Sequence, residues 1–183
     1  MKVKPWMQLL AALLCLPVGA AAEGAAEAST AAPGPHFAAG DAQFARDAAL
    51  FFVAQIGHNK LVLRRSQDAA LRALAQRLVN DDMALTRHLR AIMEARREPY
   101  NQPLPLPEIR QHQALQRRIG EDFDAAYQRM QLIALVQAAD SFAQHLERTE
   151  DPLLRRWAQD ALPLLRAQLG HTEALTGPPG PDA

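Results

Sequence analysis

The sequence predicts an all-α fold, in which four long helices form a bundle and one short helix lies between the second and third long helices. In four long segments, apolar residues recur every three or four positions, which places them on one face of an α-helix. No segment alternates between apolar and polar residues with period two, and no βαβ spacing appears. Prolines concentrate in one connector at positions 98–106. Together these observations indicate helices packed on helices.

The first two long helices are expected to form an antiparallel hairpin. Asp41 is the expected N-cap of a helix that ends near Arg65, and Ser66 or Asp68 opens the next helix, which ends near Arg97. The break between them is short, so the helices should be neighbours. The expected inner faces are Phe44, Ala48, Phe51, Gln55 and Val62 in the first helix, and Leu71, Leu74, Leu78, Asp82, Leu85, Leu89 and Ile92 in the second.

A proline-rich connector at 98–106 is expected to be extended, because Pro99, Pro103 and Pro105 cannot share a helix interior. Pro107 suits the first turn of a short helix over Glu108–Ile119. Two topologies remain open. If this segment runs the length of the bundle, the second and third long helices are parallel, as in ferritin-like folds; if it merely turns, the bundle is up-down-up-down.

The third long helix, Gly120–Glu147, is the longest uninterrupted helical pattern. The last long helix has Asp151 as its N-cap, starts at Pro152 and ends near Thr176. Pro163 removes one backbone hydrogen bond within it, so a kink is expected there. The expected inner faces are Phe123, Tyr127, Met130, Ala134, Ala138 and Phe142 in the third helix, and Leu154, Trp157, Ala161, Leu164 and Gln168 in the last.

The two ends of the chain lie outside the predicted bundle domain of residues 41–176. Residues 1–22 combine Lys2 and Lys4, an apolar run and Ala20–Ala22, the order of a cleavable signal peptide. Lipid anchoring at Cys15 is disfavoured, because Leu14 precedes it where a small residue is needed. Residues 23–40 read as a flexible leader and 177–183 as a disordered tail. The predicted location is the periplasm.

Charge and cysteine content exclude several classes of function. Cleavage after residue 22 leaves 18 basic and 20 acidic residues, a net charge of about −2, which disfavours nucleic-acid binding. It also removes the single cysteine, so the mature chain has no thiol or disulfide chemistry. The mature chain contains no expected transmembrane segment. Paired arginines, such as Arg64–Arg65, are flanked by acids and read as solvated helix surface; contact with anionic lipid, an envelope protein or another envelope surface is the alternative.

Three runs resemble the exported bacterial family of domain of unknown function 4142: Leu74–Asp82, Gly120–Tyr127 and Ala161–Leu169. The resemblance covers about residues 41–176 and implies a ferritin-like bundle of the cell envelope with a largely uncharacterised role. Its motif positions in this sequence are Asp81, Phe123, Asp124, Tyr127, Leu135 and Pro163. Where the family pattern has a Glu, an Asp-His pair and two further His, this chain has Gln55, Asp81–Asp82, Leu135 and Gln168. Leucine cannot bind a metal and glutamine is a poor ligand.

The sequence indicates no catalytic residues, no cofactor and no metal site. A di-iron site needs carboxylates on four helices and Glu-x-x-His motifs, and the sequence has no such motif. The histidines read as solvated or capping, and no nucleophile follows a triad pattern. Gln55, Asp82 and Gln168 are instead expected to meet as an interior polar cluster, since buried polar groups need partners. The expected function is a non-catalytic binding or structural envelope module. The alternative is a metal-binding or redox stress protein with a site around Asp81 and Asp82.

Overall fold

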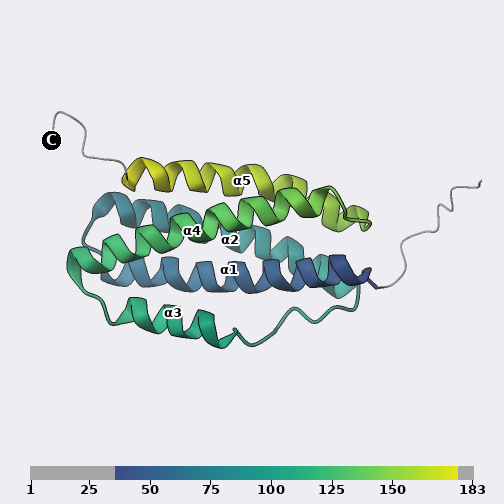
Figure 1. Ribbon diagram of the computed structural model, residues 1–183, viewed down its shortest axis with the longest axis horizontal. Coiled ribbons are helices and arrows are strands. Elements are labelled where there is room, and N and C mark those ends of the chain that lie inside the picture. The colour runs from purple at the N-terminus through teal and green to yellow at the C-terminus, as the bar shows by residue number, and fades with distance from the viewer. Residues whose placement is uncertain (1–35, 177–183) are drawn as a thin grey trace, which may run out of the picture. The chain divides into compact units, whose positions relative to one another are not determined.

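The computed structural model describes residues 36–176, and within this range every regular element is an α-helix. The all-α prediction is confirmed. Four long helices and one short helix follow one another along the chain (Figure 1). Their bounds are Ala39–Arg65 (α1), Ala69–Ala95 (α2), Leu106–Gln116 (α3), Gly120–Leu146 (α4) and Pro152–Thr176 (α5).

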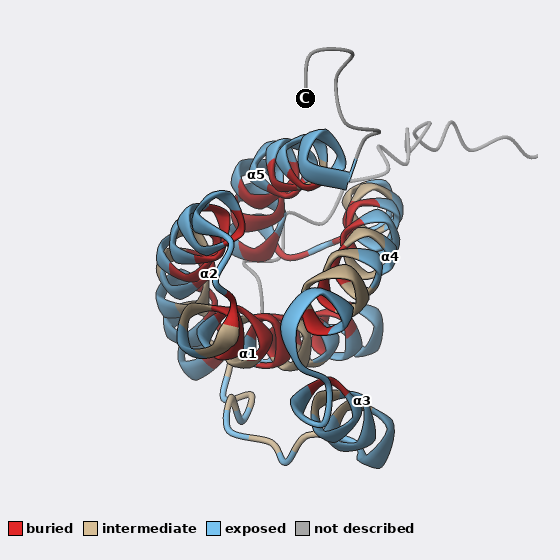
Figure 2. Cartoon of the chain, turned by 90° about the vertical axis from the view of Figure 1, so that its left-hand side faces the viewer, coloured by how far each residue is buried: buried red, intermediate tan, exposed pale blue. Residues whose placement is uncertain are grey.

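The four long helices form a ring in which α1 packs on α2, α2 on α5, α5 on α4, and α4 on α1 (Figure 2). Phe44, near the start of α1, contacts Phe142, near the end of α4, so α1 and α4 are antiparallel. Arg96, just after α2, pairs with Asp151, just before α5, so α2 and α5 are also antiparallel. α1 and α2 form an antiparallel hairpin. Because α4 is also antiparallel to α1, α2 and α4 are parallel. Of the two topologies left open by the sequence, the connector that crosses the bundle length is therefore observed (Figure 1).

The short helix α3 lies outside the ring, against α1 and α4 (Figure 2). It begins and ends earlier than the predicted span of 108–119. Pro105 is its N-cap, so Pro107 falls within the first turn, where its missing N–H is tolerated. Ile119 is not helical: it is extended, largely exposed and precedes α4 as its N-cap. Gly120 then adopts φ 55°, a left-handed conformation that glycine accepts readily.

Side-chain caps are found at two of the three predicted positions. Asp68 caps α2 by accepting from the backbone N–H groups of Ala70 and Leu71. Asp151 caps α5 in the same way, accepting from Leu153 and Leu154. The prediction for Asp41 is wrong, because α1 starts two residues earlier than Asp41. The Asp41 carboxylate lies in the first turn and bonds to another part of the chain. α5 continues through Pro163, and the predicted kink stays a prediction.

The buried residues form two apolar clusters. The larger contains Phe44, Phe52, Phe142 and Trp157, whose indole N–H donates to the Leu85 carbonyl at 3.1 Å. The smaller lies toward the other end of the helices and joins residues from all but the last of the five helices. Its members are Leu61, Val62, Leu71, Ala75, Leu115, Phe123 and Tyr127.

Two predicted inner faces need correction. In α5, Leu165 is fully buried, whereas Leu164 is 41% exposed. In α4, Leu135 and its neighbour one turn earlier, Gln131, face the core, whereas Met130 and Ala134 are only half-buried. The other four residues predicted for this face, Phe123, Tyr127, Ala138 and Phe142, are buried as expected. Met130 and Ala134 face a cleft beside α1 and α3. Ile92 and Phe51 are likewise half-buried against the larger cluster.

Candidate functional site: an interior polar layer and an adjoining cleft

Buried polar residues form a layer between the two apolar clusters, which we call the polar layer. In each long helix these polar residues follow the residues of the larger cluster in the direction of the bundle end that holds the smaller cluster. The layer consists of Gln55, His58 and Asn59 in α1, Asp82 in α2, Gln131 in α4, and Gln168 and Thr172 in α5. Each is at most 4% exposed. Such groups are stable only when hydrogen-bonded, so their partners define what the layer can do.

Asp82 is the central hydrogen-bond acceptor of the polar layer. Its Oδ1 accepts a hydrogen bond of 3.0 Å from Gln168 Nε2, and its Oδ2 lies 3.5 Å from Asn59 Nδ2. The Oδ1 of Asn59 in turn accepts from the Tyr127 hydroxyl at 2.5 Å. A chain of hydrogen bonds therefore runs from α4 through α1 and α2 to α5. It ties all four long helices together at one level of the bundle.

Burial favours the protonated form of Asp82. Burial raises the pKa of its carboxyl group to about 7, the Gln168 bond opposes this shift, and the charge of Asp81 adds to it. Burial also raises the pKa of Tyr127 far above its usual range, with a contribution from Asp82. Tyr127 is therefore a neutral donor at any physiological pH. The Asp82 carboxyl group and the Tyr127 hydroxyl each contact the Asn59 amide and not each other, so they do not form a proton-transfer pair.

Of the three residues expected in the interior cluster, the structure brings two into contact. Gln168 bonds to Asp82, but Gln55 does not. The second amide on Asp82 belongs to Asn59, which lies four residues after Gln55 and so shares its side of α1. Gln55 is 4% exposed, and its Oε1 is buried without a hydrogen-bond partner. Sequence analysis missed Asn59, although it continues the spacing of Phe52, Gln55 and Val62.

The polar layer does not fit a metal site of the ferritin type. Leu135, at one of the family's polar positions, packs in the larger apolar cluster and offers no ligand atom. Asp82 already accepts from two amides, and Asp81 is only partly buried. Within residues 36–176, no three His, Cys, Asp or Glu side chains come together as a metal-binding group.

The remaining motif positions are distributed along the bundle. Phe123 is buried in the smaller cluster, and the Arg65 guanidinium lies 5.6 Å from its ring centre. Asp124 is partly buried, with one carboxylate oxygen enclosed and without a partner. Pro163 lies on the exposed side of α5. These positions do not converge with Asp82 and Tyr127 on a single site.

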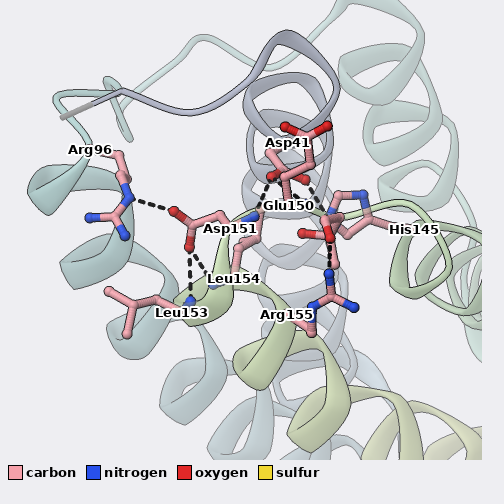
Figure 3. Close-up of polar contacts among 9 residues, drawn as sticks. Asp41, Arg96, His145, Glu150, Asp151, Leu153, Leu154 and Arg155 are labelled. Atoms are coloured by element: carbon pink, nitrogen blue, oxygen red, sulfur yellow. Dashed lines mark hydrogen bonds and ion pairs between the residues drawn. The ribbon is translucent and has the colours of Figure 1, made fainter. Parts of the chain in front are cut away.

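A second polar network lies at the end of the bundle where α4 turns into α5 (Figure 3). Asp41 Oδ2 accepts from the backbone N–H groups of Glu150 and Asp151 at 3.1 and 2.8 Å. Asp151, besides capping α5, pairs with Arg96 at 2.5 Å. Three helix ends and one turn are thus fixed by two buried carboxylates. This network reads as structural, because each carboxylate is occupied by groups of the chain.

His145 belongs to this network and corrects the expectation of a solvated histidine. Its ring stacks on Phe44, with centroids 3.7 Å apart and planes 8° apart. Its Nε2 lies 3.3 Å from Asp41 Oδ1, close enough for an ion pair but outside hydrogen-bond geometry. Burial lowers the pKa of His145, Asp41 opposes the shift, and Arg155 adds to it. The lowered pKa favours the neutral imidazole, and this ring stacks on Phe44.

A cleft of about 370 Å³ lies between α1, α3 and α4. Its walls are mostly apolar, and Gln55 and His58 of the polar layer line it together with Ala134 of α4. The volume falls in the range of small-molecule sites, which combine apolar walls with a few fixed polar groups. The charged residues of the lining are Asp47 and Glu108, both acidic. The cleft thus adjoins the polar layer through Gln55.

His58 also departs from the expectation of a solvated histidine. It is 3% exposed, and its ring stacks with that of His112 on α3, with centroids 5.3 Å apart. Burial lowers the pKa of His58 to about 4, and His112 adds to the shift. Burial and the charge of Arg64 lower the pKa of His112. His58 is therefore neutral at physiological pH.

Comparisons with known proteins concern both sequence and fold. The family model described as domain of unknown function (DUF4142) matches residues 26–175. No curated protein matches the chain. A DUF305 fragment from Deinococcus radiodurans has a similar structure, with TM-score 0.69, 17% identity, and coverage of 77% of this chain and 97% of that one. A DUF305 protein from Streptomyces coelicolor, described as a predicted secreted protein, has TM-score 0.64 and 15% identity, with 74% and 89% covered. At these identities the two structures support the fold alone.

Proposed function

We propose a function for this chain from the premise that it belongs to the DUF4142 family. The protein is an exported, non-catalytic module that binds a small molecule in the cleft between α1, α3 and α4. The main observation behind this proposal is the cleft. It is large enough for a ligand, it is mainly apolar, and its buried polar groups are an amide and a neutral imidazole. Neither group is paired with a nucleophile or an acid that could start a reaction.

Export to the periplasm is part of the proposal. It rests on the signal-peptide pattern of residues 1–22, which lie outside the described residues. The Streptomyces coelicolor neighbour, as a predicted secreted protein, agrees with export. Among the described helices, none has the length and apolarity of a membrane span.

The metal-binding alternative around Asp81 and Asp82 receives less support. Asp82 would have to give up amide donors in order to coordinate an ion, and Asn59 and Gln168 would supply only amide oxygens after rotation. Two carboxylates and two amides form a hard-oxygen set without imidazole, which suits zinc and copper poorly and lacks the four-helix carboxylates and histidines of a di-iron site. We therefore assign the polar layer a structural role beside the cleft.

Native mass spectrometry of protein isolated from the periplasm tests the binding function. A non-covalent small-molecule adduct is expected on the wild type. It should be lost in Ala134→Trp, which fills the cleft, and retained in Ala167→Trp, which places the same side chain on the exposed side of α5. An adduct that survives Ala134→Trp would place the ligand elsewhere.

A further inference from the structure

The cleft has one polar side chain whose hydrogen bonding is incomplete within the protein. Gln55 is 4% exposed and its Oε1 is buried without a partner, although the amide lies next to the hydrogen-bonded layer around Asp82. A buried carbonyl oxygen left unpaired is unfavourable, and native proteins rarely leave one so. The oxygen itself is enclosed, but Gln55 also lines the cleft, so a molecule in the cleft can complete the bonding of this amide when the amide turns its oxygen toward the cleft.

The charges around the cleft restrict the ligand further. Among the described residues that line it, the ionisable groups are Asp47, Glu108 and His58, so the lining holds two acids and no lysine or arginine. His58 is buried between the cleft and the ring of His112 and adds no positive charge. Carboxylate, phosphate and sulfate ligands would meet acidic side chains and no cation. They are therefore disfavoured.

α3 leaves one end of the cleft accessible. The C-terminal half of α3 is fixed: Leu115 is buried, His112 stacks on His58, and Arg65 donates to the Gln116 carbonyl. At the other end, Pro105 and Glu108 line the cleft, and Leu106 is 66% exposed. A ligand can therefore extend an apolar body along α1 and α4 without displacing the core.

We propose that the cleft binds a non-anionic amphiphile with an apolar chain and a hydroxyl head group, and that Gln55 recognises the hydroxyl. This deepens the proposed function and rests on it. A hydroxyl both donates and accepts, so it can pair with an amide whichever way the amide is turned. The apolar chain fills the space beside Met130, Ala134 and Phe142.

Titration of the purified full mature protein with 1-octanol, octanoate and octylamine, followed by NMR shifts of the α1 and α4 amides, tests this inference. 1-Octanol is expected to bind at least about tenfold more tightly than octanoate. Gln55→Leu, of similar volume, should weaken octanol binding about tenfold and leave octanoate unchanged, the usual effect of losing one buried hydrogen bond. Gln137→Leu is the matched control, since Gln137 lines the cleft but is exposed.

The outcomes separate the ligand class from the function. If all three probes bind equally and Gln55→Leu changes nothing, while Ala134→Trp abolishes binding, the hydroxyl inference is overturned and the binding function stands. If octanoate binds most tightly, the inference about charge is overturned. If octylamine binds most tightly, the hydroxyl inference is overturned. If no probe shifts the cleft amides in wild type, and the periplasmic protein carries no adduct, the binding function fails as well. Circular dichroism of each variant checks that it is folded.

Discussion

Gln168 on α5 donates a 3.0 Å hydrogen bond to Asp82 on α2, across 86 residues of sequence. This contact and the Asn59 contact hold a carboxyl group in the middle of a bundle without a cation beside it. Burial is the main cause of the raised pKa of Asp82, since the amide donors offset only part of the lost hydration, and the charge of Asp81 adds to the shift. The polar layer is therefore sensitive to pH, although its bonding is internal.

The raised pKa of Asp82 predicts how stability depends on pH. The folded pKa is about 7 against an ordinary value of 3.8, so the folded state binds the proton more tightly. Stability from this group is full below pH 4 and is lost as pH rises toward 7. Asp82→Asn should lie within about 1–2 kcal/mol of wild type at pH 5. From pH 5 to pH 8, wild type should lose about 2–3 kcal/mol relative to the variant.

Urea unfolding of both proteins at pH 5, 6, 7 and 8 measures this difference, and groups common to both proteins cancel. A difference in unfolding free energy that stays constant over this range would show that the carboxyl group is ionised in the fold throughout.

Adjacent leucines on α5 test the assignment of its buried face. Leu165→Ala should lower the free energy of unfolding by about 2–5 kcal/mol, because Leu165 is fully buried. Leu164→Ala should change it by less than about 1 kcal/mol, because Leu164 is 41% exposed. Phe123→Ala and Trp157→Ala should each lower it by about 3–5 kcal/mol. The reverse order for the two leucines would restore the face expected from sequence spacing.

Asp41 should contribute to stability through the turn between α4 and α5. Asp41→Ala leaves the backbone N–H groups of Glu150 and Asp151 without their acceptor, so unfolding should become easier by about 1–3 kcal/mol. Asp47→Ala is the matched control on the exposed side of the same helix and should shift it by about 0.5 kcal/mol at most. Equal effects measured by thermal unfolding would mean that the turn does not depend on Asp41.

Processing of the chain gives a prediction outside the described residues. If the signal-peptide interpretation of residues 1–22 holds, intact-mass measurement of the exported protein should give a chain that begins near Glu23. A lipid-modified chain that begins at Cys15 would contradict it and would place the protein on a membrane surface.

Much of the architecture was predictable because apolar spacing determines which face of a helix is buried. Leu71 to Leu89 in α2, and Asp82 among them, lie where the spacing places them. Spacing does not decide which of two adjacent apolar residues faces the core. Leu164 and Leu165 show this, since both leucines fit the same stripe and only Leu165 is buried. Asp41 was misassigned because α1 begins at Ala39 without a side-chain cap, which local sequence does not indicate.

The candidate site was predictable only in part. Asp82 and Gln168 stand out as polar residues on apolar stripes, and they meet. Asn59 sits on the same side of α1 as Gln55, and only the relative rotation of α1 and α2 decides which amide reaches Asp82. The cleft depends on where α3 packs, and a helix with one buried residue carries little sequence signal for its position. The stacking of His58 on His112 and of His145 on Phe44 follows from tertiary contacts alone.

Metal analysis of the mature protein tests most directly whether this bundle holds a hydrogen-bonded polar layer in place of a metal site. Wild type and Asp82→Asn should be exposed to iron, zinc and copper in equimolar amounts, dialysed and assayed for bound metal. The polar layer predicts far less than one equivalent of each metal on both proteins, because Leu135, Asn59 and Gln168 leave no ligand set for these ions. One equivalent on wild type that is lost in Asp82→Asn would contradict this prediction and favour the metal-binding alternative.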